Sequence, residues 1–136
     1  MEPILRVKDL SKSFSRAGKN EFFAVDHVSF DVMPGEILGI VGESGSGKST
    51  IAKLITRQID ATTGTIEIDG QDITKLTGRQ LIPVYAKIQM VFQTPTGSFD
   101  PRRTLGDGIC ESLRNKGVSK AEREAKARGL LEQCGL

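Results

Sequence analysis

Nine consecutive residues in the first half of the chain have the spacing of a phosphate-binding loop, G-x-x-x-x-G-K-[ST]. They are Gly42, Glu43, Ser44, Gly45, Ser46, Gly47, Lys48, Ser49 and Thr50. A polyphosphate needs many donors, and glycines let successive backbone N–H groups point toward it without an intervening Cβ. We expect Lys48 to reach the β- and γ-phosphates, Ser49 to bind Mg²⁺ through its hydroxyl, and Thr50 to donate on the α-phosphate side. The motif therefore predicts a nucleotide site.

The residues on either side of this loop favour the same interpretation. Residues 37–41 form a short apolar run, typical of a parallel strand that is buried on both faces. Ile51, Leu54 and Ile55 then recur at the period of a helix with one buried face. A glycine-rich turn without function is the alternative, but the four fixed positions arise by chance only about once per 10⁴–10⁵ positions.

Composition and length limit the remaining function classes. A chain of 136 residues suits one domain. The net charge is +2 and the basic residues are scattered, which argues against a nucleic-acid surface. The sequence has no apolar run long enough to span a membrane, and its first ten residues lack the layout of a signal peptide, so we expect a cytosolic protein. Cys110 and Cys134 lack metal-ligand spacing and are predicted core residues, whereas His27 is predicted to be a surface or packing residue.

The first half of the chain is patterned as an antiparallel sheet around the predicted loop. Residues 4–7 are strand-like, and residues 28–32 alternate between apolar and polar side chains. Residues 15–20 form a polar loop, and Pro34-Gly35 is typical of a turn. Residues 65–68 alternate again before an Asp69-Gly70 turn, which indicates a hairpin.

The second half of the chain turns from strand to helix. Residues 87–93 are predicted to form a strand, followed by a loop rich in small polar residues. A helix is predicted from Thr104, with Leu105, Ile109 and Leu113 on one face and Gly117 at its end. Ser119 and Glu122 form a capping-box signature. The buried face of the helix that follows is predicted to contain Ala127, Leu130, Leu131 and Cys134.

The phosphate loop together with the segment ending in Gln93 resembles the ATP-binding subunits of ABC transporters. In that family a strand that follows the phosphate loop ends in the glutamine of the Q-loop, as residues 88–93 do here. Four further segments are similar to the family's strands, turn and hairpin around the loop: residues 24–30, 34–36, 64–66 and 70–73.

The segment after Gln93 is similar to the peptide and nickel importers of the family. There the Q-loop is followed by a proline, here Pro95, and then by an Asn-Pro-Arg-like segment, here residues 100–102. Asp100 stands where asparagine is usual, and Thr94 stands where an acidic or amide residue is usual. These two departures concern the class of solute and leave the family resemblance intact.

The resemblance implies a role for particular side chains. Gln93 would contact Mg²⁺ or the attacking water and transmit the state of the γ-phosphate to the membrane subunit. The alternative for Gln93 is a glutamine that bonds only to backbone. An aromatic residue early in the chain would stack on adenine, and Phe14 fits best, with Phe22 and Phe23 remaining open. A plain core phenylalanine is the alternative for that position.

The family also implies cofactors, partners and a place in the cell. The cofactors would be ATP and Mg²⁺. The partners would be transmembrane permease subunits, contacted through the Q-loop region, and a second ATP-binding subunit in a homo- or heterodimer. The protein would be cytoplasmic and peripheral on the inner face of the membrane, where it would drive the import of peptides or a related solute.

The fold class implied by the resemblance is α/β, with a P-loop NTPase (RecA-like) core. The core would comprise residues 37–60 and 86–93. An antiparallel β-subdomain would comprise residues 1–36 and 62–74. The Q-loop and the start of a helical subdomain would comprise residues 94–136. The family's Leu-Ser-Gly-Gly-Gln signature, its apolar strand ending in Asp-Glu and its later histidine are not found in the sequence. We therefore expect the N-terminal half of an ABC ATPase, and the alternative is a truncated nucleotide-binding module without hydrolytic activity.

Overall fold

The computed structural model describes residues 2–15, 21–94, 97 and 99–136. The chain divides into two compact units, Met1–Tyr85 and Ala86–Leu136, and each is described by itself. Most of the polar loop predicted at residues 15–20 lies outside the described residues, as do Pro95 and Ser98 of the segment after Gln93.

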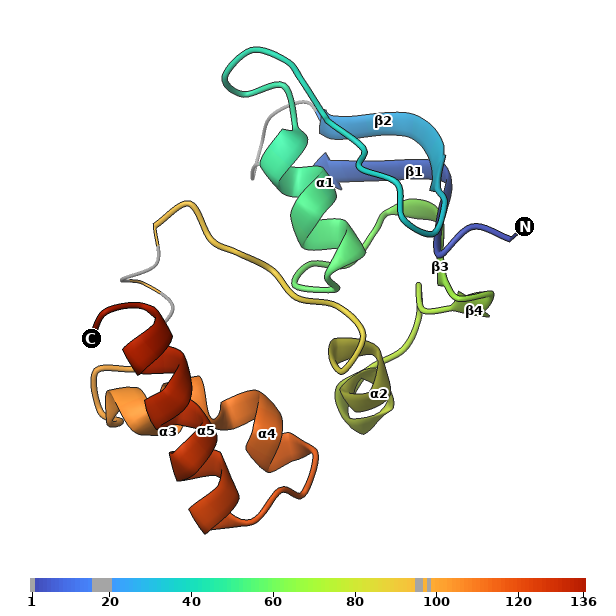
Figure 1. Cartoon of the computed structure of the whole chain (residues 1–136). Coiled ribbons are helices and arrows are strands. Elements are labelled where there is room, and N and C mark those ends of the chain that lie inside the picture. The colour runs from blue at the N-terminus through green and yellow to red at the C-terminus, as the bar shows by residue number, and fades with distance from the viewer. Residues whose placement is uncertain (1, 16–20, 95–96, 98) are drawn as a thin grey trace. The chain divides into compact units, whose positions relative to one another are not determined.

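The first unit is built on a four-stranded sheet in the order β2-β1-β3-β4 (Figure 1). Its strands are β1 (Leu5–Phe14), β2 (Phe22–Val32), β3 (Thr63–Ile68) and β4 (Gln71–Asp72). Every pairing is antiparallel, with Leu5 opposite Val32 on one side and opposite Ile68 on the other. The predicted antiparallel first part of the chain and the predicted hairpin are both confirmed. Asp69 and Gly70 turn this hairpin with φ values of 48° and 75°, as a tight β-turn between two strands requires.

The core of the first unit lies between this sheet and the helix α1 (Lys48–Ile55), which packs beside β2 (Figure 1). Helix α1 buries the predicted Ile51 and Leu54. Apolar side chains are the main component of the core because burial removes them from water. Its buried members include Val7, Leu10, Val25, Ile51, Leu54, Ile66, Ile68 and Ile73.

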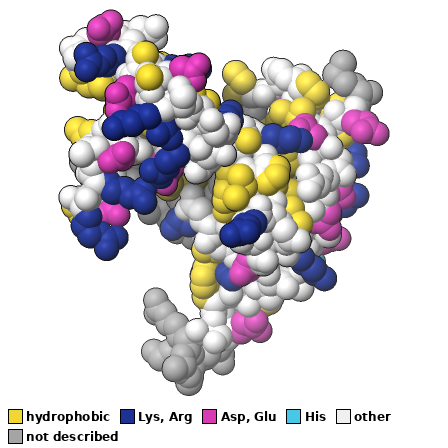
Figure 2. All heavy atoms as spheres, turned by 90° about the horizontal axis from the view of Figure 1, so that it is seen from below, with side chains coloured by type: hydrophobic (Ala, Val, Ile, Leu, Met, Phe, Trp, Pro, Cys, Tyr) yellow, Lys and Arg dark blue, Asp and Glu magenta, His cyan; other side chains and the backbone are white. Residues whose placement is uncertain are grey.

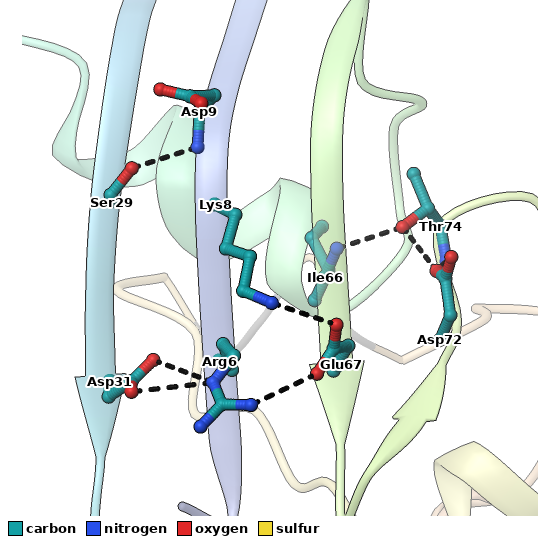
Figure 3. Close-up of polar contacts among 9 residues, drawn as sticks. All are labelled: Arg6, Lys8, Asp9, Ser29, Asp31, Ile66, Glu67, Asp72 and Thr74. Atoms are coloured by element: carbon teal, nitrogen blue, oxygen red, sulfur yellow. Dashed lines mark hydrogen bonds and ion pairs between the residues drawn. The ribbon is translucent and has the colours of Figure 1, made fainter.

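Charged side chains connect the three longer strands (Figure 3). Arg6 on β1 lies 3.4 Å from Asp31 on β2 and 3.7 Å from Glu67 on β3. Lys8 lies 3.5 Å from the same Glu67. Because these side chains are partly exposed, each pair contributes only about 0.2–1 kcal/mol to stability. Their main effect is to favour the observed strand register over registers that are shifted along the strands.

Two bulges with left-handed residues interrupt the pairing of β1 with β2, at Asp9 and at His27. Their φ values are 45° and 47°. The Asp9 N–H donates to the Ser29 hydroxyl at 2.8 Å (Figure 3), and the His27 N–H donates to the Ser11 hydroxyl at 2.9 Å. Each bulged amide therefore finds a side-chain acceptor on the opposite strand in place of the ladder partner that it lacks.

Helices account for the remaining regular structure of the described residues. The first unit ends with η1 (Gly78–Leu81) and α2 (Ile82–Tyr85), and the second unit contains α3 (Leu105–Ile109), α4 (Glu111–Asn115) and α5 (Lys120–Gln133). The predicted capping box at the start of α5 is confirmed, since Ser119 accepts from the Glu122 N–H and Glu122 reaches back to Ser119. Gly117, with φ of 75°, ends α4 as predicted.

Two predicted strands are wrong in this structure. Residues 37–41 and residues 87–93 have no strand conformation, and Ile37, Val41 and Val91 are 96%, 96% and 93% exposed. A strand exists only when a neighbour pairs with its N–H and C=O groups, and within the described residues no other strand pairs with either segment. Figure 2 shows hydrophobic side chains on the surface, interspersed with Lys and Arg.

Several burial predictions for the helices need correction. The helix predicted from Thr104 is divided at Cys110, and Leu105 at its start is 66% exposed. Ala127 is buried as predicted, but Leu130 is 47% exposed and Cys134 is also exposed. Cys134 is the C-cap residue at the end of α5. Cys110 is buried and His27 is exposed, as predicted.

Within the described part of the chain, none of the helices is both long enough and apolar enough to cross a membrane.

The contact between β3 and the first bulge generates a stability prediction. Gly64 has φ of 90°, and a Cβ there would overlap the Asp9 carbonyl oxygen and lie 2.6 Å from the Leu10 Cα. Gly64→Ala should therefore lower the free energy of unfolding by about 3 kcal/mol, combining left-handed strain with a backbone clash. Urea unfolding followed by circular dichroism measures the loss.

Gly70→Ala is the matched control for this substitution. Gly70 also has a positive φ, 75°, but a Cβ there would have no other atom within 4 Å. Gly70→Ala should lower the free energy of unfolding by only about 1 kcal/mol, because it adds left-handed strain without a clash. Equal unfolding midpoints for the two variants would contradict the close approach of Gly64 to β1.

Candidate nucleotide-binding site

The predicted phosphate loop leads directly into α1. Gly47 is the N-cap in a left-handed conformation, with φ of 92°, and the helix begins at Lys48. The first N–H groups of a helix lack partners within it, and they attract anions together with the helix dipole. The first turn of α1 contains no acidic residue that would compete with an anionic ligand.

Gly47 also fixes the loop against the sheet. A Cβ at this position would overlap the carbonyl oxygen of Ala24 on β2, so only glycine allows the approach. Gly45 has a left-handed backbone as well, with φ of 84°, but space is open around its α-carbon. The two glycines therefore do different things: Gly45 permits a turn, whereas Gly47 permits a contact.

The Lys48 ammonium lies within its own loop. Its Nζ is 2.7 Å from the Gly42 carbonyl oxygen, 2.6 Å from the Glu43 carbonyl oxygen and 3.2 Å from the Ser46 hydroxyl. These three neutral acceptors match the three donors of an ammonium group. Phosphate oxygens are charged acceptors and form stronger hydrogen bonds with lysine than neutral ones do. A bound polyphosphate can therefore draw Lys48 away from these acceptors.

A hollow of about 290 Å³ opens beside the loop. It is lined by Phe14, Phe22, Ala24, Gly45, Gly47, Lys48, Ser49 and Thr50. Aromatic rings from β1 and β2 thus share one hollow with polar groups of the loop and of the first turn of α1. Ligand pockets start at about 300 Å³, so the volume suits part or all of a small ligand.

The structure separates the three aromatic candidates. Phe14 and Phe22 lie opposite each other in the pairing of β1 with β2, and both line the hollow. Phe23 is opposite Ser13 and is not among the lining residues. The Lys12 ammonium lies 5.2 Å from the centre of the Phe14 ring, a cation–π distance.

The residues present fit a magnesium ion that arrives with a nucleotide. Ser49 lines the hollow, and its hydroxyl is the hard oxygen ligand that Mg²⁺ prefers. In the described ranges no group of three or more His, Cys, Asp or Glu side chains gathers around a common point. Mg²⁺ bound to phosphates keeps several waters and uses only one or two protein ligands, so it needs no such cage.

Gln93 belongs to the second unit, where its side chain is exposed. A separate hollow of about 640 Å³ in that unit is lined by residues 89–92 and by residues from Phe99 to Glu111, but not by Gln93. The predicted contact of Gln93 with Mg²⁺ or water therefore stays a prediction.

Sequence reasoning missed one residue of this site and left another undecided. Ala24 was not predicted, although its carbonyl oxygen limits position 47 to glycine. Phe22 was only an alternative to Phe14, yet both line the hollow. The available signal was the two-residue period of β2, which places residues 22 and 24 on one face, but the bulges obscure that period.

Comparison with known proteins identifies the family. Residues 25–136 match the family profile described as ABC transporter. A Brucella ovis protein that bears the name of a peptide import ATP-binding protein is 41% identical over 135 residues, which are 98% of this chain and 42% of that protein. The glutathione import ATP-binding protein GsiA of Shigella dysenteriae is 44% identical over 142 residues, covering 99% of this chain and 23% of GsiA. The chain thus spans less than half the length of these curated relatives.

Solved structures show the same likeness in three dimensions. The ATP-binding cassette MJ0796, in a dimeric post-hydrolysis state bound to ADP and Pi, superposes with a TM-score of 0.84 at 28% identity. The match covers 97% of this chain and 57% of the cassette. A nucleotide-free cassette from an ABC transporter matches 89% of this chain and 44% of its own, with a TM-score of 0.64 at 31% identity.

These matches confirm both the fold class and the family predicted from residues 42–50 and 88–93. The family profile covers most of the chain, and it includes the whole loop that lines the hollow. The chain belongs to the ABC transporter family.

Proposed function

We propose that this chain is the ATP-binding part of an ABC importer, in which binding and hydrolysis of ATP drive import of peptides or a related solute. The observation that carries the proposal is the hollow where Phe14 and Phe22 meet the phosphate loop, because it offers a stacking surface at one end and phosphate donors at the other. The names of the relatives, a peptide importer and a glutathione importer, support the solute class.

Each part of the site has a proposed role. Residues 42–50 hold the phosphates, with Lys48 on the β- and γ-phosphates and the Ser49 hydroxyl on Mg²⁺. Phe14 stacks on the adenine, with Phe22 beside it across the strand pair. Bound Mg²⁺ would neutralise charge that develops on the phosphates during transfer. Gln93 senses the γ-phosphate through the metal or the attacking water.

The proposed partners follow from the same family. Transmembrane permease subunits would contact the region around Gln93, and a second ATP-binding subunit would complete a dimer. The MJ0796 cassette is dimeric in its solved structure, which supports the second partner. The protein would be peripheral on the cytoplasmic face of the membrane. The subdomain limits predicted from the sequence remain part of this proposal.

The role of Lys48 can be tested by nucleotide binding. Lys48→Ala should weaken ATP binding by about 10- to 100-fold, because it removes charge-assisted contacts to the phosphates. Isothermal titration calorimetry with ATP and MgCl₂ measures the change. Lys53→Ala is the matched control, since Lys53 lies in the last turn of the same helix and lines no part of the hollow. Equal ATP affinities for wild type and Lys48→Ala would contradict the proposal.

The 136-residue chain on its own should bind ATP without hydrolysing it. Hydrolysis requires an oriented water, a held metal and charge stabilisation from a second subunit. The sequence supplies Lys48, Ser49 and Gln93 but contains neither a Leu-Ser-Gly-Gly-Gln signature nor an Asp-Glu pair. A phosphate-release assay should therefore match the background measured with the Lys48→Ala variant. Turnover in the range of about 1–100 s⁻¹, which vanishes in that variant, would show the expectation to be wrong.

A further inference from the structure

We propose that Ser11 is a positioning residue for the aromatic end of the site. Its buried hydroxyl holds the bulge at His27, and that bulge determines that Phe22, and not Phe23, lies across from Phe14. The inference rests on the proposed binding of ATP in the hollow and adds a determinant that lies outside the lining residues.

Ser11 is the only polar side chain among the most deeply buried ones in the described part of the chain, with 1% of its surface exposed. Its hydroxyl accepts the His27 N–H at 2.9 Å. Its backbone carbonyl accepts the Thr62 N–H, also at 2.9 Å, and ties β1 to the chain leading into β3. The Ser11 hydroxyl therefore bonds to β2, whereas the Ser11 carbonyl oxygen bonds to the chain that leads into β3.

The strand register shows what the two bulges do. From the pair Val7–Phe30 to the pair Leu10–Val28, β1 advances by one residue more than β2, at the Asp9 bulge. From Leu10–Val28 to Lys12–Val25, β2 advances by one residue more than β1, at the His27 bulge. The second bulge thus compensates the first. A further one-residue shift, between Lys12 and Ser13, completes the register that pairs Phe14 with Phe22.

Releasing the His27 bulge alone would shift the end of β2 by one residue. Phe23 would then lie opposite Phe14, and Phe22 would move to the other face, because neighbouring strand residues point to opposite faces. In the observed register Phe22 lines the hollow and Phe23 does not. The identity of the second aromatic ring in the site therefore depends on the His27 bulge.

Ser11 is the group that makes the bulge favourable. A bulged amide has no ladder partner, and burying it without an acceptor is costly. Ser11→Ala would remove the acceptor inside the sheet. Ser29 makes the equivalent bond to Asp9, but Ser29 is exposed, so water can replace its hydroxyl.

The test compares two ligands on the full 136-residue chain. ATP uses both ends of the hollow, whereas inorganic tripolyphosphate uses only the phosphate end. Because one phenylalanine takes the place of the other, Ser11→Ala should exchange the ring on which ATP binding depends. In wild type, Phe22→Ala should weaken ATP binding about tenfold, a fraction of the value of one stacked base, and Phe23→Ala should not. In the Ser11→Ala background, Phe23→Ala should weaken ATP binding and Phe22→Ala should not, and tripolyphosphate binding should stay unchanged in every variant. Calorimetry measures both affinities, and circular dichroism checks that the variant is folded.

Two further variants test whether Ser11 acts on ATP binding through the register of β2. Ser29→Ala removes the exposed counterpart bond and should leave ATP affinity unchanged. Phe22→Ala should weaken ATP binding, and adding Ser11→Ala to Phe22→Ala should restore part of the loss, because Phe23 would then lie opposite Phe14.

The outcomes decide between the alternatives. An unchanged effect of Phe22→Ala in the Ser11→Ala background overturns the inference, and so does an equal loss for ATP and tripolyphosphate in Ser11→Ala, which would indicate general loosening. A further loss in the Phe22→Ala background also overturns it. Wild-type protein that binds neither ligand would instead overturn the proposed function on which the inference rests.

Discussion

The close approach of Gly47 to the Ala24 carbonyl is the constraint on which the rest of the site depends. This one contact joins β2, the phosphate loop and the start of α1, and it leaves no room for a Cβ. Because the contact fixes where α1 begins, it also fixes Lys48 and Ser49 in the first turn, beside the hollow. In the proposed function, phosphate recognition would therefore start from a packing requirement, and the charges would act within the space that the packing leaves.

The two ends of the hollow have different structural origins. The phosphate end is local, since one loop and one helix turn provide all of it. The aromatic end is assembled from two strands outside that loop, and their register is set by bulges and by pairs such as Arg6–Asp31. Substitutions in the sheet should therefore affect base recognition separately from phosphate recognition, because only the register couples the sheet to the site.

Local signals made part of this structure predictable. The phosphate loop, the Asp69-Gly70 turn and the capping box at Ser119 each depend on a few adjacent residues, and sequence reasoning located all three. Strands depend on distant neighbours, and the apolar pattern from which residues 37–41 and 87–93 were predicted as strands does not show those neighbours, so both predictions were wrong. The sequence left Phe22 and Phe23 open beside Phe14 for a related reason, because left-handed residues such as His27 change the register without a sequence signature as clear as glycine.

The unequal burial of the two cysteines gives the second unit a built-in reporter. Cys134 is exposed at the end of α5, whereas Cys110 is buried with its thiol 3.4 Å from the Arg123 carbonyl oxygen on that helix. A thiol-specific reagent should therefore label Cys134 in the native protein and reach Cys110 only when the packing between α5 and its neighbours opens. The rate at which the second thiol reacts would then report the local opening of this helical unit, without the introduction of any probe residue.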